Sequence, residues 1–255
     1  MHKIVIIGSG NLATHLSLAL FKIGHQITQV YSRQIDNAQA LALKFNCKAI
    51  SNLNDLDEHA DLYIIAVSDC AISKIIEKVN FASKKVVHTA GSESLSVFKG
   101  NIENYGVFYP LQTFSKIREI NFSNVPICIE ANNEEFKLFL NKLAKQISNN
   151  IWNIDSETRK ILHLSGILVN NFVNHLYFLA EDILKEKDIP FKILQELIKE
   201  TEAKATDIGP EHAQTGPAKR NDLETQKKHL DLLSSKPNLK QIYELISKDI
   251  FLKYN

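Results

Sequence analysis

The sequence lacks an excess of charge of either sign. Its 255 residues carry 30 Lys and Arg against 29 Asp and Glu, a formal net charge of +1. Because nucleic-acid-binding domains usually carry a clear basic excess, we expect no nucleic-acid partner. Hydrophobic residues make up 44% and charged residues 23% of the chain, which is the composition of a globular protein.

Cysteine is scarce as well. Cys47, Cys70 and Cys128 are odd in number and far apart, and they lack the spacing of metal ligands. This usage predicts buried, reduced thiols rather than a disulfide framework. The sequence also has no H-x-x-E-H motif and no cluster of carboxylates, so we expect no catalytic metal.

Long hydrophobic runs are missing too. The first apolar run, Ile4–Ile7, is too short for the core of a signal peptide. The stretch 162–180 is the most apolar one later in the chain, but two histidines and three asparagines interrupt it. A hydrocarbon core would not accept these side chains, so we predict a cytoplasmic protein without a membrane partner.

Two halves of the sequence differ in their hydrophobic pattern. Up to about residue 155, short β-branched runs alternate with helix-like stretches such as 11–23 and 71–79. Unbroken runs such as Ile64–Val67 suit strands that are buried on both faces. The seven runs are 3–7, 27–31, 48–50, 62–67, 85–88, 105–108 and 126–130. The alternation predicts an α/β fold with a doubly wound parallel sheet in residues 1–155.

The second half, residues 156–255, is predicted to be an all-helical domain. Apolar residues recur every three or four positions from Ile161 to Ile183, which indicates one long amphipathic helix with Ser156 as its N-cap. Helices are also expected after Pro190 and over 222–233 and 238–252. The long helix has more apolar surface than such a domain buries, so we predict a homodimer through the C-terminal helices.

A glycine-rich turn follows the first predicted strand and begins a helical pattern. It fits the fingerprint G-x-G-x-x-G/A, in which the first glycine makes a tight turn and the second lets the backbone approach a pyrophosphate. The third small residue permits close packing, and the helix N-terminus attracts the phosphates. The predicted cofactor-binding residues of this turn are Gly8, Ser9, Gly10, Asn11, Leu12 and Ala13. The alternative is a tight turn without a ligand.

The end of the second predicted strand favours NADP over NAD. An NAD enzyme places an acidic residue there, whereas this strand is followed by Ser32 and Arg33. Both side chains could bind the 2′-phosphate of NADP, Arg33 by a charge-assisted contact, or Arg33 could be a solvated loop charge.

The end of the fourth predicted strand is expected to contact the dinucleotide through Ala66, Val67 and Ser68. Asp69 directly follows. It could line the cofactor crevice, or it could only cap the helix that begins near Ala71.

Together these features resemble the NADP-dependent oxidoreductases with an N-terminal Rossmann domain and a helical C-terminal domain. This superfamily includes pyrroline-5-carboxylate reductases, β-hydroxyacid dehydrogenases and ketopantoate reductases. A closer resemblance is to Rossmann-like proteins with a DUF2520 C-terminal domain. The motifs that carry it are His88-Thr89-Ala90-Gly91-Ser92, the stretch 106–114 (GVFYPLQTF), and Gly209-Pro210 followed by residues 215–222 (TGPAKRND). The resemblance implies the fold and an NADP cofactor but no substrate.

One departure from the superfamily affects the expected chemistry. The hydroxyacid dehydrogenases and ketopantoate reductases carry a lysine four residues before an asparagine on the interdomain helix. If that asparagine is Asn171, the lysine position holds Ile167; if it is Asn170, it holds Gly166. The resemblance therefore does not extend to the lysine-dependent mechanism, whereas imine reduction of the pyrroline-carboxylate type needs no such lysine.

His163 is the first candidate for the group that transfers a proton during hydride transfer, since imidazole titrates near neutral pH. His163, Asn171 and His175 recur on one predicted helix face, with further asparagines beside them. Such a polar stripe could orient a substrate, with Asn171 as its second catalytic candidate. It could equally be a wet helix face or a dimer contact.

Three further residues are catalytic candidates. His88 ends the fifth predicted strand, where a side chain could lie near the nicotinamide or simply bond to backbone. Arg220 could bind a substrate carboxylate. Asp222 could position Arg220 or cap the next helix.

The sequence thus predicts an NADP-dependent oxidoreductase that transfers hydride between the cofactor and a small, anionic carbonyl or imine compound bound between the two domains. The alternative is an NADP-binding sensor or scaffold without catalysis.

Overall fold

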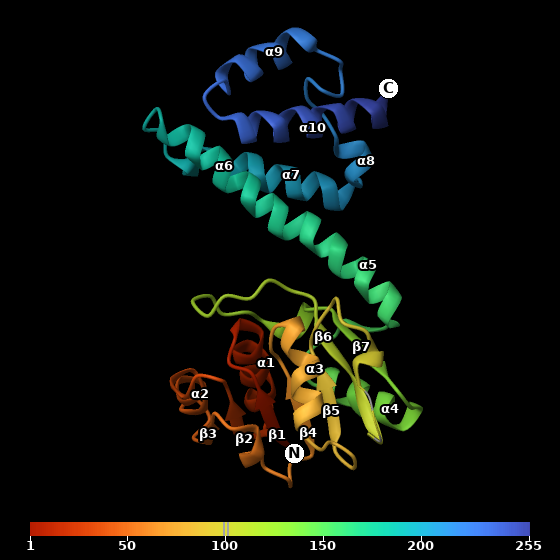
Figure 1. Ribbon diagram of the computed structural model, residues 1–255. Helices are drawn as coiled ribbons and strands as arrows, with labels where there is room; N and C mark the ends of the chain where they lie inside the picture. The colour runs from red at the N-terminus through yellow and green to blue at the C-terminus, as the bar shows by residue number, and fades with distance from the viewer. Residues whose placement is uncertain (99, 101) are drawn as a thin grey trace. The chain divides into compact units, whose positions relative to one another are not determined.

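The computed structural model describes residues 1–98, 100 and 102–255 (Figure 1). They form two compact units, Met1–Asn171 and Phe172–Asn255.

The first unit is an α/β structure built on one eight-stranded sheet. Its strands are β1 (Lys3–Ile7), β2 (Gln26–Tyr31), β3 (Lys48–Ile50), β4 (Leu62–Ile65), β5 (Lys85–His88), β6 (Asn104–Pro110), β7 (Ile127–Ala131) and β8 (Ile151–Asn153). Its α-helices are α1 (Asn11–Lys22), α2 (Ile35–Ala42), α3 (Asp69–Lys78), α4 (Glu134–Ala144) and α5 (Ser156–Gly166). The short 3₁₀ turns are η1 (Leu53–Asp55), η2 (Leu95–Val97) and η3 (Phe122–Asn124).

The strand order is β3-β2-β1-β4-β5-β6-β7-β8, and β3 to β6 pair in parallel. This is the doubly wound Rossmann arrangement, so the fold predicted from the sequence is confirmed. The sheet is not parallel throughout, because β7 pairs antiparallel with β6. Strand β8, which pairs in parallel with β7, was missed by the sequence analysis because it is three residues long and mostly exposed.

Both faces of the sheet are buried, which explains the unbroken apolar runs. Ile4 and Ile6 point to one face and pack in a cluster with residues of α1, α2 and α4. Val5 and Ile7 point to the other face and pack with residues of α3. The side chains of β4 alternate between the same two clusters, so β1 and β4 are covered on both faces.

The long helix predicted from Ile161 to Ile183 is present, but it is not α-helical throughout. Helix α5 passes into a π-helical segment, η4 (Ile167–Phe172), which passes into α6 (Val173–Lys185). Its N-cap is not Ser156 but Asp155, whose carboxylate accepts a hydrogen bond of 2.7 Å from Thr158 N. Ser156 is the first helical residue, and its hydroxyl instead bonds Glu130 and Leu95 N.

The second unit is helical, as expected. Its remaining elements are η5 (Phe191–Leu194), α7 (Gln195–Asp207), α8 (Pro210–Ala213), α9 (Leu223–Leu232) and α10 (Pro237–Tyr254). Among its described residues, only Ala218 and Leu233 are buried apolar residues.

The expectation of three buried thiols is wrong for one of them. Cys128 is buried and Cys47 is half-buried, whereas Cys70 is exposed in the first turn of α3. Within the part of the chain that the structure describes, no helix is both long and apolar enough to cross a membrane.

Candidate active site

The glycine-rich turn between β1 and α1 contains two glycines in opposite surroundings. Gly8 has φ +128°, and a Cβ built on it would lie 2.0 Å from Ala66 O. Its N–H donates to Tyr31 O at 2.8 Å, so the turn lies directly against the ends of β2 and β4. A Cβ on Gly10, by contrast, would meet nothing within 4 Å. Gly8 is therefore required by the fold, whereas Gly10 leaves open space that a ligand can approach.

The N-terminus of α1 is suited to an anion. Gly10 is the N-cap and gives no side-chain hydrogen bond to the first N–H groups of the helix. Unpaired N–H groups and the helix dipole both favour a phosphate at this position. Leu12 is half-buried, Ala13 is buried, and Ser9 lies half-exposed in the turn. The side chain of Asn11 donates to Phe114 O at 2.8 Å, which ties the segment after β6 to the same turn.

Ser32 and Arg33 directly follow β2, beside this turn in the sheet order. Ser32 N donates to Ile50 O at 3.1 Å, and its side chain is half-exposed. Arg33 is exposed, and it forms no ion pair with the carboxylates of the described residues. Its guanidinium is thus available to an anionic ligand.

Ala66, Val67 and Ser68 continue from β4 toward α3. Ala66 N donates to Ile7 O at 2.8 Å, so the ends of β1 and β4 are joined at the glycine-rich turn. Asp69 does not cap α3, as one alternative had it, because it is already the first helical residue and Ser68 is the N-cap. Its carboxylate instead accepts a hydrogen bond from the Ser92 hydroxyl.

Tyr109 and His163 form a hydrogen-bonded pair beside this edge of the sheet. Tyr109 lies at the carboxyl end of β6, and its Oη lies 3.1 Å from His163 Nδ1 on α5. Gly91 makes room for them: a Cβ there would lie 2.5 Å from His163 Nδ1 and 2.8 Å from the Tyr109 ring. Since Ser92 follows Gly91, the contact from Ser92 to Asp69 connects this pair with the end of β4.

Burial keeps Tyr109 a neutral phenol. It raises the pKa of Tyr109 to about 12, and the nearby Cys128 and Asp69 act in the same direction. The hydroxyl is therefore a stable hydrogen-bond partner for either protonation state of His163.

A buried ion pair holds the start of α5 against the sheet. Arg159 is 1% exposed and bonds Glu130 of β7 and the backbone oxygen of Glu93. Ser156 also bonds Glu130, at 2.8 Å. These contacts fix the helix that carries His163.

His88 ends β5, but it is fully buried. Burial and, to a smaller extent, the charge of Arg159 lower the pKa of His88 to about 3. Its Nδ1 accepts a hydrogen bond from Ala90 N at 3.2 Å. His88 is thus a buried, neutral histidine whose ring accepts a hydrogen bond from the backbone.

For the other catalytic candidates predicted from the sequence, the structure shows only their exposure and their local contacts. Asn171 is exposed in η4, a π-helical segment of the kind often found at functional sites. In the second unit, Arg220 is exposed. Asp222 is the N-cap of α9 and accepts a hydrogen bond of 3.0 Å from Thr225 N, which lowers the pKa of its carboxyl. No group of three or more potential metal ligands occurs among the described residues.

The fold and the turn together define a protein with a Rossmann-type dinucleotide-binding domain. Two family models match: residues 3–91 match "NADP oxidoreductase coenzyme F420-dependent", and residues 125–250 match "Domain of unknown function (DUF2520)". Among curated proteins, none matches significantly.

Solved structures give the relationship over the whole chain. The "putative NADP oxidoreductase BF3122" from Bacteroides fragilis is 41% identical, with 98% of both chains covered and a TM-score of 0.92. Protein TM1727 from Thermotoga maritima is 23% identical, with 95% and 97% covered and a TM-score of 0.75. A reductive aminase from Aspergillus terreus, in complex with NADPH and ethyl-5-oxohexanoate, shares the fold at 12% identity, 98% and 94% coverage and a TM-score of 0.73.

The chain belongs to the NADP oxidoreductase family with a Rossmann half and a DUF2520 domain. The resemblance stated from the sequence and the NADP cofactor are both confirmed.

The sequence analysis missed Tyr109, Ser92 and Arg159 as members of this site. Tyr109 and Ser92 stood in motifs that carried the family resemblance, but no spacing rule connects them with His163. Arg159 lies on a predicted helix like any surface arginine, and only the tertiary structure shows that it is buried.

Proposed function

We propose that this chain is an NADP-dependent reductase of a small anionic carbonyl or imine compound, with His163 as the proton donor. The observation that carries the proposal is the pair of Tyr109 and His163, which lies at the same sheet edge as the glycine-rich turn. In this family the cofactor is NADP, and NADPH supplies a hydride to the substrate carbon.

Different segments of the chain would bind different parts of the cofactor. The N–H groups at the start of α1 would hold the pyrophosphate, with Gly10 allowing close approach. Ser32 and Arg33 would hold the 2′-phosphate, and residues 66–68 would line the rest of the site. The exposed guanidinium and the uncapped helix support this assignment.

His163 would deliver the proton that the reaction needs. In its protonated form, Nδ1–H donates to Tyr109 Oη and Nε2–H donates to the substrate oxygen or nitrogen. The Nε2 proton then moves to that atom, and His163 becomes neutral while Tyr109 keeps its own proton. Tyr109 would thus be a positioning residue that fixes the imidazole ring.

The remaining candidates would act on the substrate's polar groups. We propose that Asn171 orients the substrate and that Arg220 binds its carboxylate, with Asp222 holding the turn of Arg220 by capping α9. Residues 156–255 would form the substrate and dimerisation domain.

The test is a panel of small oxo acids and cyclic imino acids, each paired with its neutral ester, added to NADPH-saturated protein. A substrate should raise the melting temperature and oxidise NADPH. We expect His163→Ala to lower turnover about 10²- to 10⁴-fold without changing NADPH affinity. Arg220→Ala should raise KM about 10- to 100-fold for the acid and not for its ester.

Tyr109→Phe tests whether the Tyr109 hydroxyl positions His163, because the substitution removes the hydroxyl and keeps the ring. Tyr105→Phe on the same strand is its control. We expect Tyr109→Phe, and not the control, to change the tautomer of His163 measured by nitrogen NMR. If no compound of the panel binds or is reduced while NADPH binding is intact, reduction of these compounds is excluded, and that result favours the NADP-binding sensor.

A homodimer is the second part of the proposal. Helices α6 and α7 expose large apolar side chains, including Phe178 at 56% and Leu197 at 64%. Since the described part of the second unit has hardly any buried apolar residues of its own, a second copy of the chain would supply the missing core.

A further inference from the structure

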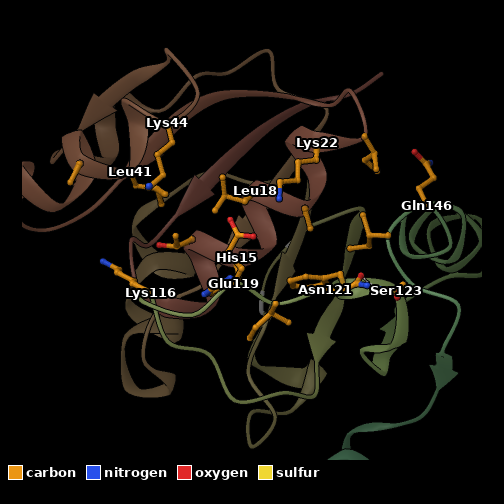
Figure 2. A pocket seen from close by; sticks show the side chains of 17 residues that line it. His15, Leu18, Lys22, Leu41, Lys44, Lys116, Glu119, Asn121, Ser123 and Gln146 are labelled. Atoms are coloured by element: carbon orange, nitrogen blue, oxygen red, sulfur yellow. Dashed lines mark hydrogen bonds between the residues drawn. The ribbon is translucent and has the colours of Figure 1, made fainter.

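A cavity of about 780 Å³ lies in the first unit, and none of the residues assigned to the cofactor lines it. Its walls come from α1, α2, the segment 116–123 and the residues after α4 (Figure 2). Cavities of this size are typical of sites for small molecules.

The cavity is rich in positive charge. Lys22, Lys44 and Lys116 line it from three separate segments, against the single carboxylate of Glu119. Figure 2 shows Lys44 and Lys116 on one side of the view and Lys22 toward the other. None of these four groups forms an ion pair with another of the described residues, although the chain as a whole has a net charge of only +1. All three lysines are exposed, and an anion bound in the cavity would be attracted by their charge.

The rest of the lining is largely apolar. It includes Leu18, Ala19, Ile23, Leu41, Ile120, Phe122 and Ile147. A simple inorganic ion would leave this surface in water, so the lining suits a ligand with both an anionic group and an apolar body.

The wall formed by 116–123 is fixed at both ends. His15 Nε2 lies 2.9 Å from Ser115 O, and the Phe114 ring packs against His15 and Phe122. At the other end, Ser123 O accepts a hydrogen bond of 2.8 Å from Asn149 N. The cavity is therefore part of the folded structure rather than a gap beside a free loop.

We propose that this cavity is a second binding site, separate from the cofactor site, for an organic anion that combines a phosphate or carboxylate with an apolar body. Lys22, Lys44 and Lys116 bind the anionic group, and Leu18, Leu41 and Phe122 contact the apolar body.

The test uses NADPH-saturated protein, so that the cofactor site is occupied. The probe is 1-naphthyl phosphate, followed by fluorescence anisotropy, with 1-naphthoate as the carboxylate arm and 1-naphthylmethanol as the neutral analogue. Both anions, or one of them, should bind with an affinity that falls as salt rises, and the neutral alcohol should bind at least 10-fold more weakly.

Charge variants locate the site. The double substitution Lys22→Glu/Lys44→Glu should weaken binding of the anions at least 10-fold. Its matched control is Lys74→Glu/Lys78→Glu, which makes the same change of charge on α3, where both lysines are exposed and outside the cavity. The milder pair Lys22→Gln/Lys44→Gln serves if the first variant does not fold. Equal binding of the neutral alcohol, or equal losses in the α1/α2 and α3 variants, would overturn the proposal.

Discussion

Gly8 and Gly10 belong to one turn, but substituting Gly8 should lower stability, whereas substituting Gly10 should lower NADPH affinity. Gly8→Ala places a Cβ 2.0 Å from Ala66 O at φ +128°, so we expect it to lower the free energy of unfolding by at least about 2 kcal/mol. A Cβ on Gly10 meets no protein atom within 4 Å, so we expect Gly10→Val to fold normally. It should nevertheless lose at least about 100-fold in NADPH affinity, because its side chain occupies the approach of the pyrophosphate. Urea unfolding and fluorescence titration measure the two effects. Retained NADPH affinity in Gly10→Val would remove the assignment of the turn.

Arg33 should distinguish NADPH from NADH. Loss of one charge-assisted contact to the 2′-phosphate should weaken NADPH binding about 10- to 100-fold in Arg33→Ser, with less than about a 3-fold effect on NADH. Arg118→Ser is a matched control, since Arg118 is also an exposed arginine. Titration of each variant with NADPH and with NADH gives its change in affinity for each cofactor relative to the wild-type protein. Equal losses for NADPH and NADH would show that Arg33 does not bind the phosphate.

His88 should make the stability of the protein depend on pH. Its pKa is lowered from 6.5 to about 3 by burial, so below pH 6.5 the unfolded chain takes up a proton that the folded chain refuses. Stability is therefore present above pH 6.5 and lost as the pH falls toward 3, by about 2 kcal/mol between pH 7 and pH 5. In His88→Asn this contribution to the pH dependence of urea unfolding should disappear. The exposed His59→Asn should leave it unchanged, and an equal effect of both substitutions would contradict the assignment.

The residues that the sequence analysis missed share a physical reason. A turn that binds phosphate is encoded within six consecutive residues, so Gly8, Gly10 and Ala13 could be recognised directly. The pair of Tyr109 and His163 joins positions 54 residues apart, through a gap that Gly91 leaves open. No local pattern encodes such a contact. The three lysines of the cavity are scattered in the same way.

At the level of elements, the hydrophobic pattern predicted seven of the eight strands, because buried parallel strands are continuous apolar runs. It could not predict the direction of β7, since a buried antiparallel strand has the same composition as a parallel one. It also could not predict the π-helical segment η4, because the apolar spacing of three and four residues continues through it. The helical second half followed from the same spacing.

The anchoring of α5 should depend on its buried ion pair. Arg159→Met leaves the half-buried Glu130, at 16% exposure, without its cation, so we expect a loss of about 3 kcal/mol in the free energy of unfolding. Lys160→Met on the same helix removes an exposed pair with Glu157 and should cost less than about 1 kcal/mol. Urea unfolding of both variants is the measurement. If the double variant Arg159→Met/Glu130→Leu is no more stable than Arg159→Met, an unpaired Glu130 is not the cause of the loss.

At the level of the whole molecule, the two units differ in how they are stabilised. The first unit has apolar clusters on both faces of its sheet. Among the described residues of the second unit, no comparable cluster of buried apolar side chains exists, although its helices are amphipathic. Large apolar side chains exposed in this way are typical of interaction surfaces, which is the reason for the proposed dimer.

Leu197 tests whether that partner is a second copy of this chain. It is 64% exposed on α7, and a charged side chain at this position would be desolvated in an apolar interface but harmless in water. We therefore expect the wild-type protein to sediment as a dimer and Leu197→Asp to sediment as a monomer at the same concentration. Lys199→Asp on the same helix is the control, because the Lys199 side chain is 71% exposed and forms an ion pair with the exposed Glu196. NADPH titration of the monomer shows whether the first unit is still folded. A wild-type protein that is monomeric at all concentrations, or a Leu197→Asp variant that remains a dimer, would exclude these helices as the interface.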